Sequence, residues 1–157
     1  MTSLLVKVWR LLRIGTLQWY LLWVSQDKFI VGVSGIVLDA ESKILLLRHR
    51  FWKEGSWGLP GGYAKHSESL AEALQREVHE ETGYKIRVER LLELKSGYRL
   101  RLEVSFLAYL LESTLQINDK EVIEARFFGP EELPAGLLRT HRALIGATLP
   151  LKKTGIS

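Results

Sequence analysis

A run of acidic side chains follows a glycine pair in this chain, at a spacing that suits metal and phosphate chemistry. Glu77, Glu80 and Glu81 stand at positions i, i+3 and i+4. Because an α-helix turns by about 100° per residue, these three carboxylates would project from one side of a helix. Such a cluster directly behind Gly61-Gly62 predicts a site for a divalent cation and for the phosphates of a ligand.

The same helix would have to bury part of this acidic cluster. Leu70, Leu74 and Val78 recur every four residues as an apolar stripe. Glu77 and Glu81 fall within about 60° of the centre of that stripe. Carboxylates that are packed this closely and partly removed from water raise one another's pKa and destabilise the fold, unless a cation neutralises them. A site of oxygen ligands alone favours Mg²⁺ or Mn²⁺.

A solvated charged helix face, held by i,i+4 ion pairs such as Arg76 with Glu80, is the alternative interpretation. It does not account for the Leu59–Gly62 loop before the helix or for Gly83 at its end. Glycine permits positive φ and a close approach of the backbone to a ligand. The sequence therefore favours a ligand site over an ordinary surface helix.

The whole run resembles the Nudix box, G-x5-E-x7-R-E-U-x-E-E-x-G-U, in which U is a bulky apolar residue. Tyr84 departs from it, because it is aromatic where the pattern is aliphatic. The resemblance extends over roughly residues 28–149 and implies an α/β fold, the Nudix-type α/β/α sandwich with a mixed β-sheet, in which the box forms a loop-helix-loop. The positions that meet the box are Gly62, Glu68, Arg76, Glu77, Val78, Glu80, Glu81 and Gly83.

The resemblance implies a hydrolase, a pyrophosphohydrolase that acts on acid anhydrides. The implied reaction is the divalent-metal-dependent hydrolysis of a pyrophosphate bond, by metal-activated water, in a nucleoside diphosphate linked to another moiety. Arg76 is expected to orient the catalytic glutamates by ion pairing, and Mg²⁺ or Mn²⁺ is the expected cofactor. The implied metal ligands are Glu77, Glu80 and Glu81, with Glu68 as an auxiliary carboxylate and Gly61 through its carbonyl.

In this family a general base often comes from a loop beyond the box. Residues 119–128 resemble that region, and Glu121 matches its acidic position better than Glu124. An ordinary surface glutamate is the alternative interpretation of Glu121. Glu121 is therefore the predicted catalytic base.

Cations and aromatic rings around the box are candidates for substrate contacts. Arginine can hold phosphate oxygens through two hydrogen bonds, and tryptophan can stack on a base. Each such side chain is also commonly a solvated surface charge or part of a local core. The predicted substrate-binding residues are Arg48, Arg50, Trp57, Lys65 and Arg99, with Phe51 and Trp52 as further stacking candidates, whereas His66 and His141 are too isolated to be taken as ligands.

Two other functions remain open from the sequence, an RNA 5′-end pyrophosphohydrolase and a non-catalytic nucleotide-binding sensor of Nudix fold. The net charge of +4 is modest, which weighs against RNA. The complete set of box carboxylates weighs against the sensor. ADP-ribose hydrolases of the family carry a proline some way downstream of the box, where this chain has Tyr98, Arg99 and Leu100. The expected partner is a nucleotide-derived small molecule, and no DNA.

The composition fits a globular protein. The chain has 157 residues with 46% hydrophobic content, enough for one domain with a proper core. It has no cysteine, which excludes disulfides, zinc-thiolate sites and cysteine catalysis. Cytoplasm is the default compartment.

Residues 1–27 differ from the rest. Lys7, Arg10 and Arg13 recur among apolar side chains, which predicts an amphipathic helical extension before a Nudix hydrolase domain over residues 28–157. The longest uncharged stretch, 14–26, has 13 residues and is too short to span a bilayer. Packing on the core, or on a second subunit as a homodimer through residues 1–27, is favoured because core-facing amphipathic helices are commoner. The alternative is an anionic membrane surface, which would place the protein peripherally at the inner membrane face.

The remaining elements follow from periodicity and from helix-end signals. Ser67 or Ser69 would cap the acidic helix at its start, and Gly83 suits its end. In residues 98–111 apolar and polar side chains alternate, which predicts one buried and one polar face. Strands and segregated helices together imply a layered α/β sandwich. Strands are predicted over 29–39, 43–50, 85–94, 98–111 and 127–128, and a C-terminal helix over 136–149, closed by Pro150.

Overall fold

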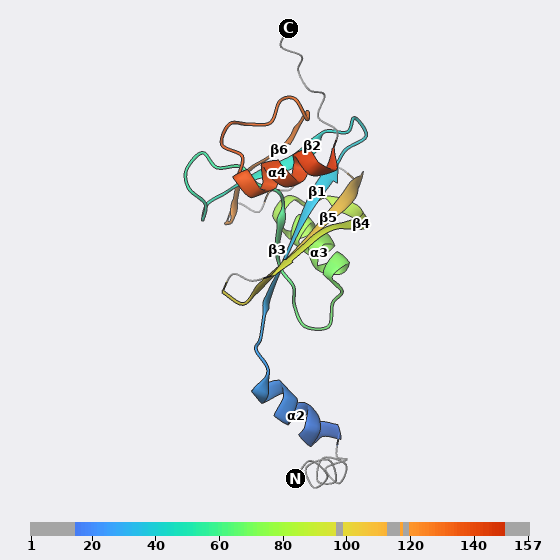
Figure 1. Cartoon of the computed structure of the whole chain (residues 1–157). Helices are drawn as coiled ribbons and strands as arrows, with labels where there is room; N and C mark the ends of the chain where they lie inside the picture. The colour runs from blue at the N-terminus through green and yellow to red at the C-terminus, as the bar shows by residue number, and fades with distance from the viewer. Residues whose placement is uncertain (1–14, 97–98, 113–116, 118–119, 150–157) are drawn as a thin grey trace.

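The computed structural model of the chain describes residues 15–96, 99–112, 117 and 120–149. Its helices and strands follow one another as shown in Figure 1. In chain order they are α2 (Gly15–Ser25), β1 (Ile30–Leu38), β2 (Ile44–His49), β3 (Gly61–Tyr63), α3 (Leu70–Thr82), β4 (Lys85–Ser96), β5 (Arg101–Glu112), β6 (Val122–Phe128) and α4 (Arg139–Thr148).

One mixed sheet forms the centre of the molecule. Its strands lie in the order β4-β5-β1-β2-β6, and β3 pairs with β1 outside this path. β1 and β5 run parallel, whereas β4–β5, β1–β2 and β2–β6 are antiparallel pairs. The predicted mixed sheet is therefore confirmed.

The side-chain alternation of the inner strands divides the core into two layers. Successive side chains of a strand point to opposite faces of the sheet. Val37 of β1 packs in a cluster with Leu74 of α3, and its neighbour Ile36 packs in a second cluster with Ile145 of α4. One helix thus covers each face, which is the predicted α/β/α sandwich (Figure 1).

The β1–β2 hairpin opens beyond its turn and admits the glycine loop between its strands. The two strands pair at Leu38 and Ile44. Farther along, Leu47 of β2 and Gly58 exchange backbone hydrogen bonds of 2.8 and 2.9 Å. On the other side, Gly62 of β3 lies opposite Val33 of β1. The loop predicted before the acidic helix is therefore built into the sheet as a short strand, which the sequence did not indicate because glycines carry no strand pattern.

Two strand predictions are wrong in extent. β6 begins at Val122 rather than at Phe127, because it pairs with β2 along its whole length as an edge strand, where charged side chains are tolerated. The polar face expected along β5 ends early, because Leu107, on the same face as Ser105, packs in the core cluster with Ile145 of α4. There Ser105 is buried, and its hydroxyl lies 3.0 Å from that of Ser34.

The N-terminal helix does not pack on the core of the chain. The six side chains from Trp19 to Val24 are each between 44% and 64% exposed. Figure 1 shows α2 standing apart, beyond the start of β1. The prediction that this segment packs on the chain's own core is therefore wrong for α2. The basic positions Lys7, Arg10 and Arg13 lie outside the described residues, and the division between residues 27 and 28 stays a prediction.

The acidic helix α3 is delimited at both ends by its own side chains and backbone. The Ser69 hydroxyl accepts a hydrogen bond of 3.2 Å from the backbone N–H of Glu72, and the Glu72 carboxylate accepts one of 2.7 Å from the N–H of Ser69. This capping box identifies Ser69, rather than Ser67, as the N-cap. Gly83 ends the helix with φ 75°, and its N–H donates to the His79 carbonyl at 2.8 Å.

Candidate active site

Glu81 is the one buried carboxylate of the described residues, with a relative exposure of 4%. The backbone N–H of Gly61 donates to its Oε2 at 3.2 Å, and His49 Nε2 lies 3.3 Å from its Oε1. Burial raises the pKa of Glu81, and the hydrogen bond from His49 opposes that shift. The contact in turn raises the pKa of His49. Three elements, α3, β3 and β2, therefore meet at this carboxylate.

Arg76 gathers the other three box glutamates. Its guanidinium donates to Glu68 at 2.8 and 2.9 Å, to Glu77 at 2.7 Å and to Glu80 at 3.1 Å. It also donates to the Tyr63 carbonyl of β3 at 2.9 Å. The hydrogen bonds from Arg76 are the main reason why the pKa of Glu68 is lowered to about 2.

Arg76 pairs with Glu68, Glu77 and Glu80, and the orienting role expected of it stays a prediction. The i,i+4 pair of Arg76 with Glu80, which a solvated helix face would also form, is among them. A solvated helix face does not explain the hydrogen bond from Arg76 to the Tyr63 carbonyl of β3, and it does not explain the burial of Glu81. These two contacts favour the ligand-site interpretation.

The two glycines of β3 each lie close to a neighbouring element, Gly61 to β1 and Gly62 to α3. A Cβ added to Gly62 would overlap the Glu77 carboxylate, coming 2.6 Å from Oε1. One added to Gly61 would lie 2.8 Å from the Cα of Ser34 in β1. Gly61 also has φ +151°, which side chains rarely permit. A side chain at Gly61 would therefore meet the β1 backbone, and one at Gly62 would displace the Glu77 carboxylate.

The donor set suits a hard divalent cation, although the side chains are not gathered into a complete coordination sphere. In the part of the chain that the structure describes, no three His, Cys, Asp or Glu side chains converge as a ready metal cluster. Mg²⁺ takes few carboxylates and completes its shell with waters and substrate phosphates. The buried Glu81 and the neighbouring oxygens of Glu77, Glu80 and the Gly61 carbonyl fit such a partial site by their chemistry. Arg76 now holds two of these carboxylates, Glu77 and Glu80.

The structure distinguishes the two candidate bases by their neighbours. Glu121 is exposed just before β6, and its carbonyl accepts a hydrogen bond of 2.8 Å from the Arg50 backbone. Its charge contributes, after Glu81, to the raised pKa of His49, so it lies on the Glu81 side of the site. Glu124, in contrast, pairs with Arg48 at 3.2 Å.

The predicted substrate-binding residues fall into different surroundings. Lys65 lies at the carboxylates, with its Nζ 3.4 Å from Glu80. Trp57 meets the edge of Phe128 at 4.9 Å and packs in the core cluster under α4, which is the local-core alternative. Arg99 lies in the turn before β5 with φ 49°. Arg48 and Arg50 line a small cavity of about 160 Å³ with His49, Trp52, Lys53, Glu54, Gly55, Ser56 and Ile123.

His141 connects the C-terminal helix to the glycine loop. Its Nδ1 accepts a hydrogen bond of 2.9 Å from the backbone N–H of Leu59. Burial lowers the pKa of His141, which favours the neutral ring that this bond requires. Its Nδ1 contact is therefore with the loop backbone.

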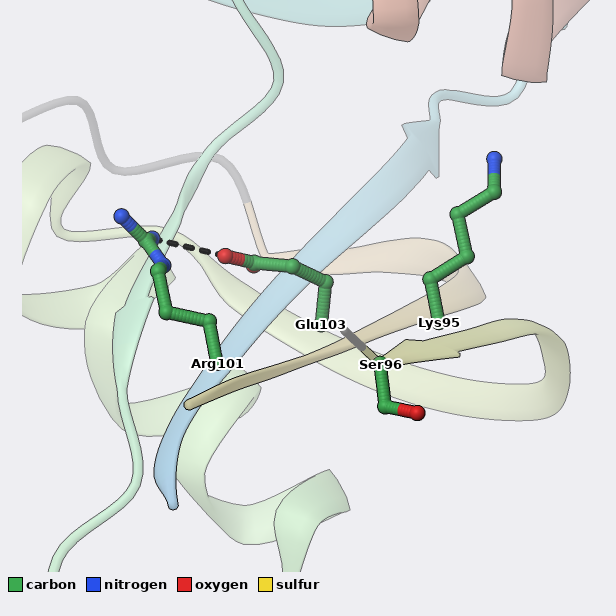
Figure 2. A pocket seen from close by; sticks show the side chains of 4 residues that line it. All are labelled: Lys95, Ser96, Arg101 and Glu103. Atoms are coloured by element: carbon green, nitrogen blue, oxygen red, sulfur yellow. Dashed lines mark ion pairs between the residues drawn. The ribbon is translucent and has the colours of Figure 1, made fainter. Parts of the chain in front are cut away.

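A larger cavity of about 550 Å³ is lined by Lys95, Ser96, Arg101 and Glu103 (Figure 2). Arg101 pairs with Glu103 at 2.7 Å, and its guanidinium lies 5.5 Å from the centre of the Tyr63 ring. The Nε of Arg101 is buried and has no hydrogen-bond partner among the described residues. Tyr63 of β3 thus contacts Arg101 of the cavity through its ring and Arg76 of the carboxylate cluster through its carbonyl.

The contact between His49 and Glu81 was not foreseen. Strand alternation offered a signal, because Leu45 and Leu47 face α3 and position 49 continues their series. The register shift between Arg48 and His49 weakens that signal, since a bulge redirects the side chains that follow it.

Comparison with known proteins identifies a family. A family model described as NUDIX domain matches residues 28–148. The chain is 32% identical over 112 residues to "Nudix hydrolase 6" of Arabidopsis thaliana, which covers 65% of this chain and 40% of that protein. It is also 32% identical over 110 residues to the "ADP-ribose pyrophosphatase" of Methanocaldococcus jannaschii, which covers 66% of this chain and 64% of that protein. The chain thus spans less than two thirds of either relative.

A solved structure agrees with the sequence relatives. The crystal structure of a NUDIX hydrolase from Nitrosomonas europaea matches with a TM-score of 0.69 and 26% identity, over 76% of this chain and 69% of that one. The predicted fold type is therefore confirmed.

The depressed pKa of Glu68 predicts a pH-dependent contribution to stability. Its ordinary value of 4.5 falls to about 2 in the folded protein. The stabilisation is therefore present above about pH 4.5 and is lost as the pH falls toward 2. We expect Glu68→Gln to lower the free energy of unfolding at pH 7, and the difference from wild type to shrink as the pH falls. Urea unfolding of both proteins in EDTA at several pH values measures this difference in the free energy of unfolding. A difference that does not change with pH would show that the Arg76–Glu68 ion pair does not stabilise the fold.

Proposed function

The chain belongs to the Nudix family, and from this we propose that it hydrolyses a pyrophosphate bond in a nucleoside diphosphate linked to another moiety, with the help of a divalent cation. The observation that carries the proposal is the gathering of the box carboxylates against β3. Glu81 is buried on the Gly61 N–H, and Arg76 holds Glu68, Glu77 and Glu80 beside it. A charge cluster of this kind is stable only when cations share it.

The positions of the box glutamates and Arg76 suggest a role for each of them in binding the cation. Glu77, Glu80 and Glu81 would hold Mg²⁺ or Mn²⁺, with Glu68 and the Gly61 carbonyl in support. The bound cation supplies neutralisation of the phosphate charge and a lower pKa for the attacking water. Arg76 keeps the glutamates oriented through its four carboxylate contacts.

Glu121 is the proposed general base. It is exposed to the solvent from which the water comes, and its charge reaches His49 at the Glu81 end of the site. Glu124 is less suited, because its carboxylate already pairs with Arg48. A base must reach the proton that it removes, so Glu121 would act through a loop that adjusts to bound substrate.

The cavity beside Tyr63 is the proposed site for one nucleoside-sized moiety of the substrate. Its volume of about 550 Å³ lies within the usual range for small-molecule sites. The unpaired Nε of Arg101 is a donor, and Glu103 is an acceptor for hydroxyl groups. On the carboxylate side of β3, Lys65 is placed to meet phosphate oxygens. Arg48 and Arg50 are proposed to bind the other end of the substrate.

The competing functions make different demands on the site. An RNA 5′-end substrate would use an extended basic surface along the strand, whereas the larger cavity is lined by two cations, one carboxylate and a serine. A sensor would bind a nucleotide without needing the buried Glu81. The archaeal relative's name includes ADP-ribose, so that compound belongs in the test.

Glu81→Gln should lower turnover at least about a hundredfold, the scale of losing a charge-stabilising catalytic group. The assay is release of a phosphorylated product from ADP-ribose, NADH, dinucleoside polyphosphates, nucleotide sugars, nucleoside triphosphates and capped RNA, with Mg²⁺ or Mn²⁺. Glu41→Gln, in the β1–β2 turn, is the matched control and should retain wild-type activity. Equal activity of Glu81→Gln and wild type would refute the site. Tight nucleotide binding without turnover by wild type would favour the sensor.

Arg101→Ala should raise KM for the best substrate about tenfold while changing kcat little, because a hydrogen bond from a charged donor to the bound moiety is lost. Arg87→Ala is the control, since Arg87 lies over Tyr109 rather than Tyr63. An unchanged KM, or a loss confined to kcat, would show that the cavity does not hold the substrate.

A further inference from the structure

Helix α2 exposes apolar side chains in every direction. No charged residue occurs in Gly15–Ser25. Trp19 to Val24 are six consecutive large residues, and each is at least 44% exposed. Because consecutive residues of a helix are turned by about 100°, these six surround the helix rather than form one stripe. A helix that is apolar all round is normally buried in a protein core or in lipid.

The exposed apolar surface continues where α2 leads into the sheet. Phe29 and Ile30 are 49% and 56% exposed. The N–H of Ile30 donates to the carbonyl of Leu100 at 2.9 Å, which brings a further side chain, 47% exposed, next to them. We call Trp19–Val24, Phe29 and Ile30 the α2 patch. Soluble monomers rarely expose this many large apolar side chains together, so the patch is expected to have a partner.

The aromatic residues of the α2 patch are of the kinds that anchor at lipid headgroups. Trp23 lies 6.4 Å from both Trp19 and Tyr20, measured between ring centres. The Lys28 ammonium lies 4.6 Å from the centre of the Trp23 ring. Tryptophan and tyrosine are enriched at membrane interfaces because one part of the ring is apolar and another is polar. Lysine beside them places a cation at the depth of the phosphates.

The charge around α2 complements an anionic surface. Residues 1–28 contain four basic side chains, Lys7, Arg10, Arg13 and Lys28, and one acidic side chain, Asp27, which makes a formal charge of +3. Basic residues near a membrane surface each add roughly 1 kcal/mol of attraction to anionic lipids. A second copy of the chain carries the same positive charge and would repel this segment.

The distribution of the exposed side chains around α2 also favours lipid over a second subunit as its partner. A single partner helix would cover one side of α2 and leave some of the six exposed side chains from Trp19 to Val24 in water. Lipid surrounds the helix. The eleven residues of α2 are too few to cross a bilayer, and in the described part of the chain no helix is long and apolar enough to do so.

We propose that α2 inserts into the interfacial layer of an anionic lipid surface and attaches the protein to it. The proposal does not depend on the proposed hydrolase activity. α2 joins the sheet at the start of β1, and in Figure 1 it lies at the opposite end of the molecule from α4. The carboxylates of α3 belong to the body of the protein, so attachment leaves them in water with their substrate.

The test is co-sedimentation of the full chain with phosphatidylcholine vesicles that contain or lack phosphatidylglycerol. Wild type should bind the anionic vesicles, less so at high salt because surface charges are screened. The double variant Trp19→Glu, Trp23→Glu should bind at least about tenfold more weakly, because it places carboxylates beside anionic headgroups. Leu111→Glu, at another exposed apolar position on β5, is the matched control and should bind as wild type.

Urea unfolding of each variant shows that the fold is intact, since Trp19 and Trp23 make no part of either core cluster. Sedimentation velocity without vesicles reports the oligomeric state. The proposal is overturned by an absence of binding to anionic vesicles, by equal binding of wild type and the double variant, or by a homodimer that the double variant dissociates.

Discussion

The close approach of helix α3 to the glycine strand β3 is the constraint on which the site depends. A side chain at Gly62 would displace the Glu77 carboxylate, and the Gly61 N–H donates its hydrogen bond to Glu81. The approach requires that the β1–β2 hairpin open so that β3 can enter, and that Ser69 and Gly83 fix where the helix begins and ends. The fold thus brings negative side chains against backbone, where water is partly excluded.

That approach makes charge balance the second requirement. Arg76 shares its guanidinium among three glutamates, and His49 is the ion-pair partner of Glu81 within the described residues. Neither the Arg76 pairs nor the His49 pair replaces a cation that is bound directly by the carboxylate oxygens. Burial raises the pKa of Glu81 because its charge is poorly solvated there. A divalent ion would add positive charge among carboxylates that are otherwise paired with His49, Arg76 and Lys65.

Local features of the site could be predicted from the sequence, and long-range ones could not. The shared side of Glu77 and Glu81 follows from helix geometry alone, and the structure confirms that Glu81 borders the core. The contact of His49 with Glu81 joins residues far apart in the chain and depends on a bulge in β2. The stacking of Arg101 on Tyr63 depends on strand order in the same way. The apolar side chains of the N-terminal segment predict that its helix is covered, but they do not indicate whether protein or lipid covers it.

The central claim is that the α3 carboxylates are arranged for a divalent cation, and cation-dependent stability tests it most directly. The measurement is the free energy of unfolding of the full chain in EDTA and at increasing Mn²⁺, without substrate. A ligand that binds only the folded state stabilises it in proportion to the logarithm of its concentration once the site is saturated. We expect the free energy of unfolding to rise in this way, by about 2.7 kcal/mol at a hundred times the dissociation constant. Identical unfolding curves in EDTA and in Mn²⁺ would contradict the account.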